Sequence, residues 1–180
     1  MVPVKVNVGC GTNKLAGWQN FDADLDITNP LPFADNTIDF ILAEHVVEHV
    51  RYRQAVLFLT ECYRVLRPGG VVRIIVPSIE RVMLYADEDY LKFVTRWVKT
   101  SDVRGAVGAI MWEHGHKTAW TESLLVATMF YVGFGTAVCE PQRSEHSELC
   151  HVDGHGRVIG DLNNWIESSI VEGTKQGELK

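Results

Sequence analysis

The sequence predicts an α/β domain with a mostly parallel sheet, and two observations support this. Short apolar runs, of which Val71-Val72-Arg73-Ile74-Ile75-Val76-Pro77 is the clearest, alternate with segments of helical periodicity. The first apolar run, Val6-Asn7-Val8, leads directly into the turn Gly9-Cys10-Gly11. Because ligands of such sheets bind at the carboxyl ends of the strands, the residues that follow each strand are the first candidates for a functional site.

The expected elements follow from residue periodicity and from turn residues. Strands are expected at residues 5–11, 19–24, 37–44, 71–77, 136–140 and 165–172. Apolar residues recur every three or four positions between about 47 and 66, which predicts a helix that Arg67-Pro68-Gly69-Gly70 should end. Further helical segments are expected over roughly 79–100 and 121–132, the latter capped by Thr121 and ended at Gly133.

The spacing of the first strands predicts a shortened N-terminal half. Only Thr12 to Trp18 separate the first two strands, whereas a full crossover takes about ten to twelve residues or more. The first crossover helix should therefore be a single turn or a loop. No crossover fits between Asp22 and Asp26, so the strand that would normally follow is expected to be missing or vestigial.

Length and composition predict one domain over residues 1–180, without a repeat or a linker. The net charge of −6 makes nucleic acid an unfavoured partner, because its affinity rests on Lys and Arg. Cys10, Cys62, Cys139 and Cys150 are widely spaced and are expected to be free thiols in a reducing cytoplasm. No signal sequence or membrane-length apolar run is recognised, so no membrane association is expected.

The glycine turn and Asp22 together suggest a site for a nucleoside-bearing cofactor. Glycine lets a ligand approach the main chain closely, and a carboxylate at the end of the second strand can accept hydrogen bonds from two ribose hydroxyls. An ordinary strand-ending turn is an equal alternative on these residues alone. The position three beyond Gly11 is Lys14 rather than glycine, which disfavours NAD or FAD.

Several segments together resemble the class I S-adenosylmethionine-dependent methyltransferases, in particular small bacterial-type, methyltransferase type 11-like members. The segments are Val6-Asn7-Val8-Gly9-Cys10-Gly11-Thr12-Asn13, Phe21-Asp22, residues 31–39, Glu44-His45-Val46-Val47-Glu48-His49 and Leu66-Arg67-Pro68-Gly69-Gly70. The resemblance implies a Rossmann-like sheet of six to seven strands with an antiparallel last strand. It assigns residues 5–80 to cofactor binding and residues 81–180 to the substrate side.

The resemblance implies S-adenosylmethionine as the cofactor and a set of residues that bind it. These are Asn7, Gly9, Cys10, Gly11, Asp22, Asp26, Glu44 and His45. Gly9 to Gly11 would pass beside the methionine portion of the cofactor, Asp22 would bind the ribose, and Asp26 is the nearest match to an acid that contacts the adenine. The expected acceptor is a small molecule or a glycan, and the chain is expected to be a monomer or a homodimer.

Three histidines are the candidate catalytic residues. His45 follows the third expected strand, where relatives place a turn against the methyl donor and the acceptor. His116 matches a histidine that precedes the helix covering the acceptor pocket in relatives. Histidine is the side chain best suited to remove a proton near neutral pH, and His49 and His116 are the candidates for that role.

Two alternatives to an active methyltransferase remain open from the sequence. The shortened scaffold is compatible with a protein of this fold that has lost catalysis and only binds a ligand. The second alternative is a zinc metallohydrolase, because the run His45-Val46-Val47-Glu48-His49 matches His-x-x-Glu-His, in which two histidines on one helix face bind zinc beside a glutamate base. We favour neither alternative and assign no metal, and we expect His146, His151 and His155 to be surface residues.

The aromatic and methionine-rich segment of the C-terminal half has two interpretations. It comprises Met111, Trp112, Trp120, Met129, Phe130, Tyr131 and Phe134. At helical spacing such residues usually belong to the core, and the alternative is an apolar acceptor pocket.

Overall fold

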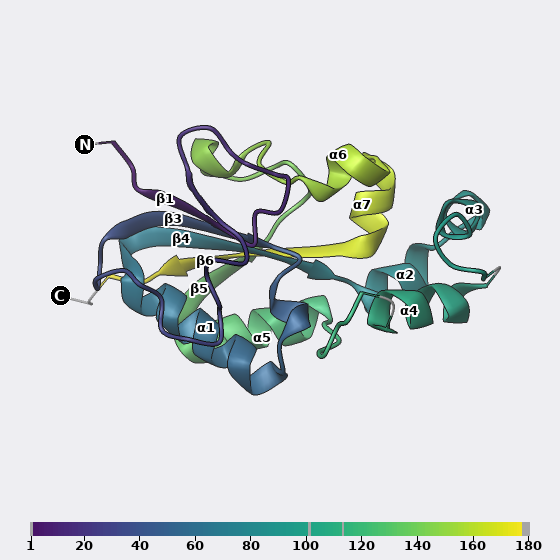
Figure 1. Ribbon diagram of the computed structural model, residues 1–180, viewed down its shortest axis with the longest axis horizontal. Coiled ribbons are helices and arrows are strands. Elements are labelled where there is room, and N and C mark those ends of the chain that lie inside the picture. The colour runs from purple at the N-terminus through teal and green to yellow at the C-terminus, as the bar shows by residue number, and fades with distance from the viewer. Residues whose placement is uncertain (1, 101, 113, 178–180) are drawn as a thin grey trace.

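The computed structural model describes residues 2–100, 102–112 and 114–177, which are built on one six-stranded sheet (Figure 1). In spatial order the strands are β2 (Gln19–Phe21), β1 (Lys5–Val8), β3 (Ile38–Glu44), β4 (Leu66–Pro77), β6 (Ser168–Lys175) and β5 (Phe134–Val138). Strands β2, β1, β3 and β4 are parallel, and β6 is antiparallel to both of its neighbours. The predicted Rossmann-like fold with an antiparallel last strand is confirmed.

Helices cover both faces of the sheet and extend beyond one end of it. Helices α1 (Tyr52–Val65) and α5 (Glu122–Val132) lie on one face, and the short α6 (His155–Ile159) and α7 (Asp161–Glu167) lie on the other (Figure 1). Helices α2 (Ile79–Tyr85), α3 (Glu88–Val94) and α4 (Val103–Trp112) form a lobe beyond the carboxyl end of β4 (Figure 1). Two 3-10 turns, η1 (Val47–His49) and η2 (Ser147–Leu149), complete the described elements.

The N-terminal half is shortened as predicted. Residues 9–18 form turns without a helix, and residues 22–37 form turns without a strand, so β2 is an edge strand of three residues. The loop that replaces the missing elements contributes buried side chains of its own, namely Leu25, Ile27 and Leu31. The core is thereby closed on this side by a loop.

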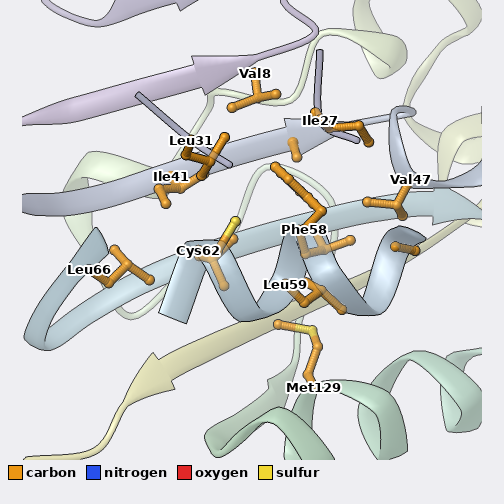
Figure 2. Close-up of a cluster of buried hydrophobic side chains, with 14 of the residues drawn as sticks. Val8, Ile27, Leu31, Ile41, Val47, Phe58, Leu59, Cys62, Leu66 and Met129 are labelled. Atoms are coloured by element: carbon orange, nitrogen blue, oxygen red, sulfur yellow. The ribbon is translucent and has the colours of Figure 1, made fainter. Parts of the chain in front are cut away.

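Helix α1 forms because one of its faces is apolar. Ala55, Phe58, Leu59, Cys62 and Val65 recur at intervals of three and four residues and are completely or almost completely buried. They pack between the sheet and α5, which adds Met129 to the same cluster, as Figure 2 shows. The free state of the four cysteines, Cys62 among them, is confirmed.

Some predicted boundaries were wrong. Helix α1 begins at Tyr52 rather than 47, and it ends at Val65 because Leu66 is already extended and pairs with Ile38 in the sheet. The Arg67-Pro68-Gly69-Gly70 run therefore lies within β4 and does not end the helix. Likewise β6 begins at Ser168, because residues 165–167 belong to α7; a short apolar run does not distinguish strand from helix.

The C-terminal half also differs from the prediction in its helices. The segment expected at 79–100 is divided at Asp87, whose carboxylate accepts a 2.8 Å hydrogen bond from the Tyr90 amide and so begins α3. Helices α4, α6 and α7 were not predicted. The expected cap is confirmed at α5, where the Thr121 hydroxyl accepts from the Leu124 amide at 3.1 Å and Gly133 ends the helix at a φ of +117°.

Candidate cofactor and acceptor site

A cavity of about 660 Å³ opens at the carboxyl ends of β1, β3 and β4. The glycine turn and the end of β3 form one side of its lining, and helices α3 and α4 supply most of the apolar side. Further lining residues are His114, His116, Gly154, His155, Val158 and Ile159. The fold therefore joins the predicted cofactor turn and the substrate half of the chain at a single cavity.

The glycine turn is held close against the residue that follows His45. Gly9 has a φ of +65°, and a Cβ at this position would lie 2.4 Å from Cγ2 of Val46, so no larger residue fits without displacement. Gly11 also has a positive φ, but a Cβ there would meet no atom within 4 Å. Beneath the turn, the buried Asn7 side chain donates hydrogen bonds to the Asn13 carbonyl at 2.8 Å and to Asn20 at 3.0 Å.

Two of the three acidic cofactor candidates, Asp22 and Asp26, lie outside the cavity lining. Asp22 follows β2 at the edge of the sheet, and its Oδ1 atom accepts a 3.4 Å hydrogen bond from the Gly11 amide. Asp26 accepts hydrogen bonds from the Thr28 amide and hydroxyl, both at 2.8 Å, and from Asn29. The hydrogen bonds from Thr28, the backbone one above all, hold the pKa of Asp26 below its usual value. Asp22 is thus beside the glycine turn, while Asp26 is engaged in its own turn.

Glu44, at the end of β3, fixes a distant segment over the cavity. Its carboxylate accepts hydrogen bonds from the Gly154 amide at 2.7 Å and the His155 amide at 2.9 Å. Asn13 reinforces the contact by donating to the Val152 carbonyl at 2.9 Å. The expectation that His155 is a surface residue was wrong, because its ring lies 4.3 Å from that of His45 and lines the cavity.

His45 is placed at the cavity by an unusual backbone conformation. Its φ of +52° turns the chain out of β3, and its Nδ1 atom lies 3.3 Å from Oε1 of Glu48. Burial acts most strongly and lowers the pKa of His45, but the close contact with Glu48 and the charges of Glu48, Glu44 and Glu167 together raise the pKa overall. The surrounding carboxylates therefore stabilise a protonated His45 beside the cavity.

His49 and His116 come together from distant parts of the chain. Their rings lie edge to face with centroids 4.8 Å apart, and both line the cavity. Nδ1 of His116 is hydrogen-bonded to the Ile110 carbonyl, and Nε2 lies 4.0 Å from Oε1 of Glu48. Burial is the main cause that lowers the pKa of His116, with smaller contributions from His49 and His114. All three predicted catalytic histidines therefore share one cavity.

Comparison with known proteins gives matches to methyltransferases. Residues 19–74 match the family described as methyltransferase domain. A segment of 101 residues is 33% identical to the ubiquinone biosynthesis O-methyltransferase of Rhizobium etli, over 52% of this chain and 39% of that protein. The match therefore spans less than two fifths of that relative's length.

Solved structures show the same fold over almost the whole chain. A complex between the Haloferax volcanii Trm112 methyltransferase activator and a methyltransferase matches with a TM-score of 0.58 and 13% identity, over 99% of this chain and 84% of that chain. A methyltransferase of Thermotoga maritima matches with a TM-score of 0.54 and 18% identity, over 98% and 84% of the two chains. These matches show that the chain has the fold of the class I S-adenosylmethionine-dependent methyltransferases. The cofactor of the family is S-adenosylmethionine.

The residues of this chain fit that cofactor at the glycine turn. Gly11 lines the cavity and has open space where a side chain would stand, so a ligand can approach the main chain there. The carboxylate of Asp22 is exposed beside it and can accept further hydrogen bonds. The absent third strand leaves β2 at the edge of the sheet on the side where Asp22 lies.

The sequence did not reveal the apolar wall of the cavity. This wall comprises Tyr90, Phe93, Val94, Trp97, Val98, Ala106, Ala109 and Ile110, from α3, α4 and the segment between them. The aromatic and methionine-rich segment that was considered for this role lies elsewhere: Trp120, Met129 and Phe134 are in the core, whereas Trp112, Phe130 and Tyr131 are exposed. A sequence signal for the wall exists only in the apolar spacing of residues 90–98.

The zinc-binding helix required by the His-x-x-Glu-His motif is not formed. His45 directly follows a strand, and residues 47–49 form a single 3-10 turn, so His45 and His49 do not share the face of one helix.

No helix in the described ranges is long and apolar enough to span a membrane.

Proposed function

We propose that this protein binds S-adenosylmethionine at the glycine turn and catalyses transfer of its methyl group to a small-molecule or glycan acceptor. One observation carries the proposal: a single cavity connects Gly9 to Gly11 with His45, His49 and His116. S-adenosylmethionine, when bound, supplies a methyl group that is already activated on a sulfonium. The residues of the chain then act mainly by holding the two reactants in line.

On the cofactor side, we assign the backbone of Gly9, Cys10 and Gly11 to the methionine portion and Asp22 to the ribose hydroxyls. Asp26 is assigned to the adenine end. Asn7 acts from below by fixing the turn through its hydrogen bond to the Asn13 carbonyl. Glu44 contributes by holding the 154–155 segment against the cavity.

On the acceptor side, His45, His49 and His116 face the same space as the apolar wall. A neutral imidazole in this group is positioned to take the proton of a hydroxyl acceptor, and burial keeps the pKa of His116 low enough for the neutral form to predominate at neutral pH. The aromatic side chains of Tyr90, Phe93 and Trp97 offer a surface for an apolar ring or a sugar face.

Calorimetric titration of the purified protein with S-adenosylmethionine and with S-adenosylhomocysteine tests the proposal. We expect both to bind with micromolar dissociation constants. If neither ligand binds, the proposal is refuted. A second outcome is that both ligands bind but that no S-adenosylhomocysteine is formed from S-adenosylmethionine when a panel of hydroxyl and amine acceptors is added. This outcome would favour a ligand-binding protein that has lost catalysis.

A further inference from the structure

A buried carboxylate lies beside the cavity without a hydrogen-bond partner. Glu48 is 1% exposed, and neither of its carboxylate oxygens accepts a hydrogen bond from the described residues. Nδ1 of His45 lies 3.3 Å and Nε2 of His116 lies 4.0 Å from its Oε1 atom. His45 compensates this charge only in part, because neither carboxylate oxygen accepts a hydrogen bond, and a second cation beside a buried carboxylate in that state would stabilise it.

The tautomer of His116 strengthens this indication. A backbone carbonyl can only accept a hydrogen bond, so Nδ1 of His116, which contacts the Ile110 carbonyl, must carry the proton. Nε2 of a neutral His116 then carries a lone pair and lies 4.0 Å from Oε1 of Glu48. Two electron-rich atoms are thus close together. A histidine that donates from one ring nitrogen to a backbone carbonyl, and so leaves the other nitrogen free, is the usual arrangement of a metal ligand.

We propose that Glu48, His49 and His116 bind a divalent transition-metal cation, for which Zn²⁺ is the probe of choice. One ligand atom from each residue lies within 4.8 Å of the other two. In a tetrahedral zinc site with bonds of about 2.0–2.2 Å, neighbouring ligand atoms are about 3.3 Å apart, so the side chains need to close by about an ångström. Two imidazoles and one carboxylate suit zinc and iron and are too few ligands for a closed structural site.

The backbone around these three residues is built to hold them together. The Glu48 carbonyl accepts hydrogen bonds from the amides of Lys117 at 2.7 Å and Thr118 at 3.2 Å. The Thr118 hydroxyl donates to the Val50 carbonyl at 2.7 Å. These bonds join the 116–118 segment to η1, so that His116 is fixed opposite Glu48 and His49, and His45 contacts Glu48 from outside the set.

The proposed cation would be open to the acceptor cavity. His49 and His116 line the cavity, whereas Glu48 is buried and does not, so a cation held by the three residues would be reached from the cavity. With the cation bound, His49 and His116 are ligands and are not free to take a proton. An oxygen of the acceptor could then bind the cation, which would lower the pKa of an acceptor hydroxyl and would narrow the acceptor to a molecule with a hydroxyl or carboxylate group. This restriction on the acceptor rests on the proposed methyltransferase function, whereas the metal site does not.

Titration of the EDTA-treated full chain with ZnCl₂, followed by calorimetry and by metal analysis after gel filtration, tests the site. We expect one zinc ion per chain. His49→Ala and His116→Ala should each weaken binding on the order of a hundredfold, and Glu48→Gln should do the same while preserving the side-chain shape. His146→Ala is the matched control, because His146 packs against Phe40 away from the cluster, and it should bind zinc as the unmodified protein does.

Circular dichroism and S-adenosylmethionine titration of the same variants separate loss of the site from loss of the fold. A variant that binds the cofactor normally but not zinc supports the proposal. The proposal is overturned if the unmodified protein binds no zinc, or if His49→Ala and His116→Ala both bind it with unchanged affinity. Zinc binding without cofactor binding would leave the metal site standing and refute only the proposed function.

Discussion

Arg73 and Asp153 form a completely buried ion pair in which the guanidinium donates from Nε at 2.8 Å and from Nη2 at 2.7 Å. A third hydrogen bond, from Nη1 of Arg73 to Glu172 at 2.7 Å, ties the pair to β6. Burial by itself lowers the pKa of Arg73, but the hydrogen bonds and charges of Asp153 and Glu172 raise it overall. Asp153 directly precedes Gly154, whose amide donates to Glu44. The ion pair therefore anchors this side of the cavity to the sheet.

Removal of one member of this pair should be strongly destabilising. We expect Asp153→Asn to lower the free energy of unfolding by about 3–5 kcal/mol, because the Arg73 charge is left buried with one carboxylate fewer. Urea denaturation monitored by circular dichroism measures this. The control is Asp35→Ala, which removes an exposed partner of Arg64 and should cost at most about 1 kcal/mol. If both substitutions lower the free energy of unfolding equally, the buried ion pair stabilises the fold no more than the exposed one.

Gly9→Ala should disturb the glycine turn through contact with Val46 as well as through backbone strain. The control is Gly17→Ala, since Gly17 has a φ of +77° but open space where an added methyl group would stand. We expect Gly9→Ala to be more destabilising than Gly17→Ala by about 1–3 kcal/mol, the usual cost of overpacking. Thermal and urea unfolding measure both variants.

A second substitution isolates that contact. In the double variant Gly9→Ala with Val46→Ala the clashing methyl group is absent, because the nearest atom to the added Cβ is Cγ2 of Val46. The two substitutions should therefore be less destabilising together than the sum of their separate effects. Simple additivity would indicate that backbone strain alone accounts for the requirement for glycine.

Asp22→Ala should weaken cofactor binding while leaving the fold intact. Asp22 is exposed and its side chain bonds within the protein to the Gly11 amide, so its loss should remove the acceptor for the ribose hydroxyls. We expect the dissociation constant of S-adenosylhomocysteine to rise about tenfold to a hundredfold. Asp35→Ala removes the same charge away from the cavity and should bind normally. Unchanged affinity of Asp22→Ala would mean that another residue binds the ribose.

Alkylation of Cys139 should depend on pH in a way that an ordinary thiol does not. Burial first, and then the negative charge of Glu172, raises the pKa of Cys139 to about 11. At pH 8 about one molecule in a thousand carries the thiolate, so the alkylation rate should rise about tenfold per pH unit up to about pH 10. Peptide mass spectrometry after iodoacetamide treatment measures the rate. In urea-unfolded protein the alkylation rate of Cys139 should stop rising at about pH 9. A rate that stops rising at that pH in the folded protein would contradict the prediction.

Much of the sheet could be predicted from the sequence because its strands are local signals. A buried parallel strand is a short apolar run, and β1, β3 and β4 all contain one. Helices α6 and α7 could not be predicted in the same way, because each is at most seven residues long and α7 follows Gly160 at a φ of +86°. Such short helices are stabilised by packing rather than by their own periodicity.

The sequence by itself determined the glycine turn, the shortened crossover and the methyltransferase resemblance, since each depends on residues close together in the chain. Only the tertiary structure decided what lies around the turn. Glu44 binds His155 and Glu48 faces His116 across separations of 111 and 68 residues, and nothing local to either segment indicates its partner. The sheet brings these side chains together because parallel strands place their carboxyl ends at one edge, whatever the length of chain between them.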